Sequence, residues 1–171
     1  MSRAFVKEPE GDEAGNDLPE RPQSPHPNYM TPGGLQYLKE KLGAMTARRK
    51  VLEADKESLG ARSELQTLQG EIRYLQRRIE VAIPVDPAGQ GTDAIRFGAT
   101  VELLDDAGAP HRFTIVGEDE ADAGRSLISW VSPLGSALLN RKTRDEITWR
   151  RPVGDLELEI SGFSYIPAKV F

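Results

Sequence analysis

The spacing of apolar residues predicts two long helices that share one buried seam. Apolar positions recur at alternating steps of three and four residues, which is the pattern of a coiled coil. The first series is Leu35, Leu38, Leu42, Met45 and Leu52, with Arg49 at its one polar position. The second series is Leu65, Leu68, Ile72, Leu75, Ile79 and Ala82, and it ends before Pro84. Each series needs a partner that covers it, so we expect the two to pack on each other.

The flanking residues predict where these helices begin and end. Thr31-Pro32 combines a capping side chain with a proline at the first helical position. Gly60 is suited to stopping the first helix, and Ser63 with Gln66 has the spacing of a capping box for the second. The short connection favours an antiparallel hairpin within one chain, about 40 Å long with its tip near residues 55–64. A dimeric coiled coil is the structural alternative.

Beyond a linker at 85–95, the pattern changes to short runs of alternating apolar residues, which is typical of β-strands. We expect antiparallel strands at 100–104, 112–116, 126–131, 146–149 and 155–165, and a short helix at 134–139. The expected core is Phe97, Phe113, Ile115, Ile128, Leu138, Ile147, Leu158 and Ile160. The predicted fold class is therefore α+β: an N-terminal antiparallel two-helix coiled coil over 30–84, followed by an antiparallel β-sheet domain with a short helix over 96–171.

The composition narrows the classes of function. The 171 residues include no cysteine and two histidines, which excludes a disulfide framework, a thiol nucleophile and a zinc site of several Cys or His ligands. A net charge of −5 argues against a protein whose main task is to wrap duplex nucleic acid. No apolar run approaches the roughly 18 residues that span a bilayer, and the first residues lack the apolar stretch of a signal peptide. We expect a cytoplasmic, monomeric protein with no cofactor, no membrane contact and a protein partner.

The charge is divided unevenly along the chain. Residues 1–28 carry 3 basic and 6 acidic groups, residues 29–84 carry 10 and 7, and residues 85–171 carry 9 and 14. The first of these segments is rich in proline and acidic residues and has few apolar groups. We predict a disordered or extended tail over 1–29, and a plain linker is the simpler interpretation of it.

Several motifs, taken in order, resemble the bacterial Gre-type transcription elongation factors. In the rod they are Met30-Thr31-Pro32-Gly33-Gly34 with Leu38, and Ser58-Leu59-Gly60-Ala61-Arg62-Ser63-Glu64, which is similar to the tip of the GreB branch. In the second part they are Phe97-Gly98-Ala99-Thr100-Val101, His111-Arg112-Phe113-Thr114-Ile115-Val116-Gly117, Asp119-Glu120 and Ser132-Pro133-Leu134-Gly135-Ser136-Ala137-Leu138-Leu139. The resemblance runs from Met30 to about Pro167. It implies a coiled-coil rod, an FKBP-like C-terminal domain and binding to RNA polymerase at its secondary channel.

The resemblance places the family's chemistry at the rod tip, where this chain departs from the pattern. In cleavage-stimulating members, two acidic side chains three residues apart help to hold the second catalytic Mg²⁺ of the polymerase. Here Ala61 stands at the first position and Glu64 at the second, and Leu68 takes the aromatic position of the tip. One carboxylate is a poor handle for Mg²⁺, although Asp55 and Glu57 lie nearby in sequence and are alternative ligands.

The rod is also about two heptads shorter than is usual in the family, which shortens its reach by roughly 10 Å. We therefore expect a Gre-like factor that is not an enzyme, holds no metal of its own and modulates elongation without efficient transcript cleavage. A weak contact of Glu64 with the polymerase's Mg²⁺ is the most that this tip predicts. A factor that stimulates cleavage on backtracked polymerase is the alternative.

The resemblance also implies which residues contact the polymerase. These are Asp119, Glu120, Ser132, Pro133 and Leu134. The last three have competing structural interpretations as a helix cap, a first-turn proline and a core residue. Asp119 and Glu120 are favoured because acidic loop residues have no evident structural role.

A set of basic residues on the rod is a second candidate interface. It comprises Arg48, Arg49, Lys50, Arg73, Arg77 and Arg78. These side chains are expected to face the nascent RNA or the DNA of the elongation complex, or acidic walls of the channel. An ordinary solvated face of the rod is an equally good interpretation.

Two alternatives come from other classes of protein. The FKBP-like resemblance raises a prolyl isomerase, but the sequence assembles no aromatic-lined proline pocket, and a fold does not imply a function. A coiled-coil adaptor with no polymerase partner would need only the rod.

Overall fold

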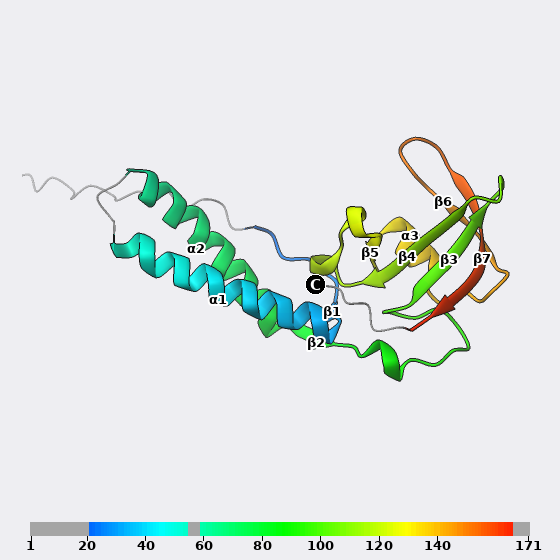
Figure 1. The fold of residues 1–171 in the computed structure, drawn as a ribbon, viewed down its shortest axis with the longest axis horizontal. Helices are drawn as coiled ribbons and strands as arrows, with labels where there is room; N and C mark the ends of the chain where they lie inside the picture. The colour runs from blue at the N-terminus through cyan, green and yellow to red at the C-terminus, as the bar shows by residue number, and fades with distance from the viewer. Residues whose placement is uncertain (1–20, 55–58, 166–171) are drawn as a thin grey trace, which may run out of the picture.

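The computed structural model describes residues 21–54 and 59–165. Two long helices form a rod at one end of an elongated molecule, and a curled sheet lies at the other end (Figure 1). The helices are α1 (Pro32–Ala54) and α2 (Leu59–Glu80). None of the helices in the described ranges is long and apolar enough to cross a membrane.

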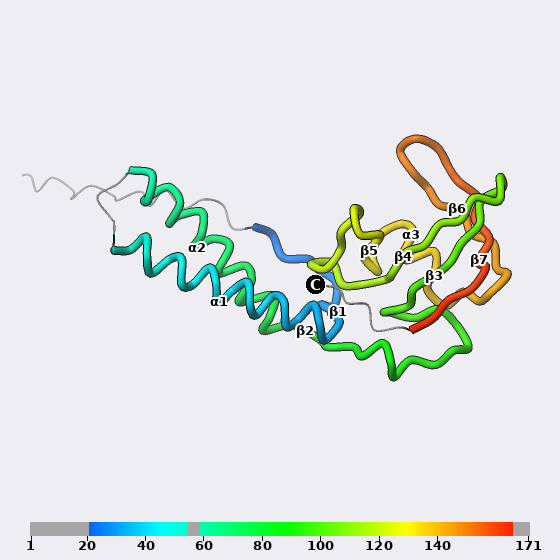
Figure 2. Tube along the Cα trace, in the orientation of Figure 1, coloured from blue at the N-terminus to red at the C-terminus, as the bar shows by residue number. Residues whose placement is uncertain are grey.

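The predicted seam between the helices is confirmed. α1 and α2 lie side by side along their whole lengths (Figure 2). Leu38 and Leu75 are buried near the base of the rod, where Leu35, Leu42, Met45 and Ile79 pack against them. Leu52 and Leu65 are buried near the tip, with Leu68 packed against them. With 23 and 22 residues, the two helices are about 35 and 33 Å long.

The start of α1 agrees with its prediction, because the Thr31 Oγ1 accepts a hydrogen bond from the Gly34 amide at 3.0 Å. The start of α2 does not. The helix already includes Leu59, so Gly60 does not stop a helix and Ser63 does not cap one. Burial of Ala61 against Leu52 and Leu65 rewards helical geometry in the first turn of α2, and this tertiary contact outweighs the local preferences of Gly60 and Ser63.

The rod ends in a small sheet. Strand β1 (Asn28–Met30) pairs in parallel with β2 (Ala82–Pro84). Because α2 ends at Glu80, Ala82 lies in a strand and not in the helical seam where it was predicted. Met30 is fully buried and packs with Leu38 and Leu75. The chain entering α1 and the chain leaving α2 are therefore held together at the base of the rod.

The second part is a five-stranded sheet in the order β5-β4-β3-β7-β6. Its strands are β3 (Thr100–Asp105), β4 (Pro110–Val116), β5 (Leu127–Ser129), β6 (Glu146–Trp149) and β7 (Leu156–Ser164), and its helix is α3 (Pro133–Leu138). The pairs β3–β4, β3–β7 and β6–β7 are antiparallel as expected. β5 instead runs parallel to β4, because the segment between them is a crossover with two short 3-10 turns rather than a tight hairpin.

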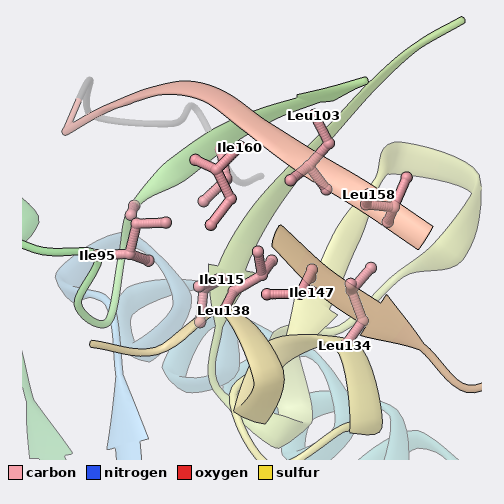
Figure 3. Packing of buried hydrophobic residues seen from close by; sticks show 10 residues of the cluster. Ile95, Leu103, Ile115, Leu134, Leu138, Ile147, Leu158 and Ile160 are labelled. Carbon is pink, nitrogen blue, oxygen red and sulfur yellow. The ribbon is translucent and has the colours of Figure 1, made fainter. Parts of the chain in front are cut away.

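The core of the sheet domain lies between the sheet and α3 (Figure 3). Five of the predicted core residues belong to it, namely Ile115, Leu138, Ile147, Leu158 and Ile160. Phe113 and Ile128 are partly buried against it. Phe97 lies instead beside Tyr29, with ring centroids 6.1 Å apart, because it belongs to the side of the domain that faces the rod.

Candidate functional site

The tip half of the rod contains two of the predicted site residues in different environments. Ala61 is 6% exposed and packs in the seam with Leu52 and Leu65. Glu64 is exposed, and its two carboxylate oxygens accept hydrogen bonds from Arg48 Nε and Nη2 at 2.7 and 2.9 Å. This bidentate contact lowers the pKa of the Glu64 carboxyl below its usual value. The seam thus turns position 61 inward, and a guanidinium already holds the carboxylate at position 64.

The described part of the tip does not fit a Mg²⁺ handle made of paired carboxylates. Mg²⁺ demands oxygen ligands in near-octahedral geometry, whereas position 61 offers a methyl group and Glu64 is bound to Arg48. Asp55 and Glu57 lie outside the described residues. Within 21–54 and 59–165, no three His, Asp or Glu side chains gather as a metal site.

Glu120 lies under the first turn of α1, where the sheet domain meets the rod. It belongs to the short turn Glu118–Glu120 and is 2% exposed. Its Oε2 accepts hydrogen bonds from the amides of Thr31 at 3.0 Å and Gly117 at 2.9 Å, and its Oε1 accepts one from the Thr31 hydroxyl. Burial raises the pKa of this carboxyl, and the hydrogen bonds oppose that shift. The carboxylate therefore satisfies an amide at the N-terminus of α1, where the helix dipole favours a negative charge.

Asp119 and Arg78 form a second set of contacts beside Glu120. The Arg78 side chain is 2% exposed and donates from Nε to Asp119 Oδ2 and from Nη2 to Asn28 Oδ1, both at 2.5 Å. The Tyr74 hydroxyl donates to Asp119 Oδ1 at 2.8 Å. Burial, followed by the contact with Asp119, raises the pKa of Tyr74 to about 12. One network thus joins α2, β1 and the sheet domain.

We call these six residues the junction: Asn28, Thr31, Tyr74, Arg78, Asp119 and Glu120. The premise that Asp119 and Glu120 have no structural role is wrong, because both join the sheet domain to the rod. Arg78 does not belong to an exposed basic face, because its side chain is buried in the junction. These charged groups hold the rod in one direction relative to the sheet domain.

The structure supports the competing, structural interpretation of the three predicted site residues at α3. Ser132 caps α3, accepting a hydrogen bond from the Gly135 amide at 3.0 Å. Pro133 is the first residue of the helix and is exposed, whereas Leu134 is 2% exposed in the core of the sheet domain. Of this group, Pro133 is the position that a partner can touch most readily.

The six basic residues of the rod do not form a single surface. Arg48 reaches across to Glu64, and Arg49 lies 3.6 Å from Glu53. Lys50 is exposed on α1, and Arg73 and Arg77 are exposed on α2. Arg73 and Arg77 share a hollow of about 590 Å³ on the outer side of α2 with Arg21.

Sequence reasoning missed the junction as a structural unit, although two signals for it were present. Arg78 follows Leu75 by three residues, which places it on the buried side of α2, where a charge requires an acidic partner. Gly33-Gly34 follows the cap at Thr31-Pro32, in a helical turn where glycine is unfavourable without a reason. The reason is contact, because a Cβ on Gly34 would lie 2.0 Å from Glu120 Oε1.

Comparisons with known proteins place the chain in a family. Residues 90–165 match the family model "Transcription elongation factor, GreA/GreB, C-term". The chain is 35% identical to transcription elongation factor GreB of Neisseria meningitidis serogroup B over 154 residues, covering 81% of this chain and 94% of the relative. It is 33% identical to GreA of Desulfovibrio desulfuricans over 150 residues, covering 80% and 93%. A solved GreA/GreB factor from Nitrosomonas europaea aligns with a TM-score of 0.41 at 21% identity, covering 82% of this chain and 99% of that one.

These matches correct one prediction and confirm another. The flat expectation that the protein is not an enzyme is wrong, because it belongs with factors that stimulate transcript cleavage by RNA polymerase, a hydrolytic reaction. The resemblance drawn from the motifs is confirmed, since the similarity to curated GreA and GreB covers four fifths of the chain. The chain belongs to the GreA/GreB family of transcription elongation factors.

Proposed function

We propose that this chain binds RNA polymerase at the secondary channel, with the sheet domain on the rim and the rod inside, and stimulates transcript cleavage only weakly. Family membership supports an elongation factor that acts on RNA polymerase. The elongated shape supports entry into a channel, since the rod projects away from the sheet domain (Figure 1). Occupancy of the channel would then modulate elongation according to the concentration of the factor relative to its dissociation constant.

The geometry of the rod tip is the observation that supports weak stimulation of cleavage. The position that the family pattern gives to its first acid is Ala61, and the seam buries this residue. The second acid, Glu64, is engaged on both oxygens by Arg48. A Mg²⁺ handle would require Glu64 to leave Arg48 and a second carboxylate to come from elsewhere. Two-metal catalysis needs both ions held in place, so a tip with one engaged carboxylate supports little cleavage.

The five residues that the resemblance assigns to polymerase binding take a revised role in this proposal. Asp119 and Glu120 fix the angle between the rod and the sheet domain from inside the junction. Ser132 and Leu134 hold α3 in place, and exposed Pro133 contacts the rim of the channel. The side chains under the surface thus shape the face that the polymerase meets. For the basic residues, we propose that Lys50, Arg73 and Arg77 face the acidic channel walls, because these three are exposed.

The test uses a backtracked elongation complex with Mg²⁺, and the Neisseria meningitidis GreB relative as the reference factor. We expect this chain to compete with the reference for the polymerase and to shorten the transcript about 100-fold more slowly, as a misplaced catalytic group does. Glu64→Ala should leave competition unchanged, and Glu40→Gln is the matched control, an exposed carboxylate far from the tip.

Two separate outcomes would overturn the two halves of the proposal. Failure of the full chain to compete with the reference factor would reject the placement in the secondary channel. Cleavage as fast as that of the reference, abolished by Glu64→Ala and retained by Glu40→Gln, would reject the account of the tip.

A further inference from the structure

The segment that precedes β1 lies against the outer side of α2. The Arg21 guanidinium stacks over the Tyr74 ring, 4.2 Å from its centroid. Asn28, at the other end of the segment, donates from Nδ2 to the Arg78 carbonyl at 2.7 Å. His26 between them contacts Trp130 edge-to-face, with ring centroids 6.0 Å apart. Residues 21–28 are therefore fixed where α2 meets the sheet domain.

These contacts also give the segment a direction. Asn28 is level with Arg78, and Arg21 is level with Tyr74, one helical turn nearer the tip. Arg21 itself lines the hollow on α2, together with Arg73, Arg77 and Gly70. The preceding residues, 1–20, therefore join the described chain beside this hollow. The distance along α2 from Gly70 to its start at Leu59 is about 17 Å. A few extended residues span this distance, so residues 1–20 are long enough to reach along the outer side of α2.

The charges of the two parts are opposite. Three arginines and one glutamate line the hollow, which gives it a net charge of +2. Residues 1–20 contain two basic residues, Arg3 and Lys7, against six acidic ones, which gives −4. The six are Glu8, Glu10, Asp12, Glu13, Asp17 and Glu20. Because the acidic segment is tethered at the edge of the basic hollow, its effective concentration there is in the millimolar range.

We propose that residues 1–20 dock on the outer side of α2 around Arg73 and Arg77 and shield this surface from other polyanions. In the isolated chain, the occupant of the basic surface is then the chain's own N-terminal segment. A competing polyanion must displace that segment before it reaches the arginines. The inference does not depend on the binding site on the polymerase, and the isolated chain is sufficient to test it.

The absence of cysteine from the sequence allows a clean spin-label experiment. A spin label on Gly15→Cys should broaden the backbone amide signals of Gly70, Arg73 and Arg77 in the full chain. The matched control carries the same label and tether, with the six acidic residues changed to their amides. We expect the broadening at Arg73 and Arg77 to be at least about twofold weaker in the control at low salt. In 1 M salt, where the screening length is about 3 Å, the two chains should become equal.

Binding of heparin gives an independent measure of the shielding. A chain that lacks residues 2–20 should bind heparin about tenfold more tightly than the full chain, because a tethered competitor has been removed. Adding Arg77→Gln to both chains should shrink this difference. Equal broadening in the acidic and amide chains at low salt would overturn the docking. Equal heparin affinity of the full and shortened chains would overturn the shielding.

Discussion

The two ends of the rod use charged residues in opposite ways. At the base, Arg78 is 2% exposed and pairs with Asp119, while buried Glu120 accepts hydrogen bonds from the start of α1. At the tip, Arg48 and Glu64 form a bidentate pair, but both side chains are about half exposed. A guanidinium and a carboxylate thus meet at each end, and water surrounds only one of the pairs.

This difference teaches where the molecule is rigid. A buried charge that loses its partner has no water to replace it, so the junction holds one arrangement strongly. An exposed pair exchanges its partner for water at little cost. The base of the rod is therefore built to fix direction, whereas the tip can release Glu64 without disturbing the fold.

Arg78→Met is expected to have the largest effect, because it leaves Asp119 without its cationic partner and Asn28 without a donor. Breaking a buried pair from one side costs about 3–5 kcal/mol of unfolding free energy, which urea titration measures. Arg77→Met, the exposed neighbour, should stay within about 0.5 kcal/mol. Asp119→Asn in the Arg78→Met background should recover part of the loss, since position 119 then carries no unpaired charge, although Glu118, 3.7 Å from Arg78, still lacks its cationic partner.

The equivalent substitution at the tip, Arg48→Met, tests whether the two ends of the rod differ in this way. Arg48→Met removes the partner of Glu64 and should leave the thermal midpoint unchanged within error, because both groups are solvated. A loss as large as that of Arg78→Met would show that the tip is as constrained as the base.

Ala61→Asp tests whether the missing acid of the tip can be restored by one substitution. The new carboxylate would enter the apolar seam beside Leu52 and Leu65, so we expect a loss of about 3 kcal/mol. Transcript cleavage should not increase. Ser63→Asp, exposed in the same turn, is the control and should stay within about 0.5 kcal/mol. A gain of cleavage in Ala61→Asp without loss of stability would place position 61 in solvent and contradict the seam.

Gly34→Ala tests the close approach of α1 to Glu120. The added Cβ would lie 2.0 Å from Glu120 Oε1, so the carboxylate must move and the protein should lose about 1–3 kcal/mol. Gly43→Ala in the same helix has no atom within 4 Å of the new Cβ. It should stabilise the protein by about 0.5–1 kcal/mol. Equal effects of the two substitutions on the urea midpoint would remove the special role of the base.

The rod and the junction also differ in how far the sequence predicts them. The seam through Leu38 and Ile72 follows from a spacing of three and four residues, which is local information. The pairing of Arg78 with Asp119 joins positions 41 residues apart, and each residue alone resembles an ordinary surface charge. Local rules also failed at Gly60 and Ser63, because the burial of Ala61 decides the helix start there. At the tip, the sequence shows which residues are present, but only the packing of the two helices shows that Ala61 is buried and that Glu64 contacts Arg48.

The last test follows a titration rather than a loss of stability, and it sharpens the picture of the base. Burial and the contact with Asp119 raise the pKa of Tyr74 to about 12, so its phenol keeps its proton more strongly in the folded chain than in the unfolded one. The stability linked to this proton is fully present below the ordinary pKa of about 10 and is lost as the pH rises toward 12. Tyrosinate absorbance should show a step near pH 12 that Tyr74→Phe removes. Asp119→Asn should lower the pH of this step without returning it to the ordinary pKa of tyrosine, because burial is the larger cause. A return to the ordinary pKa would mean that water reaches Tyr74, and the base of the rod would then not differ from the exposed tip.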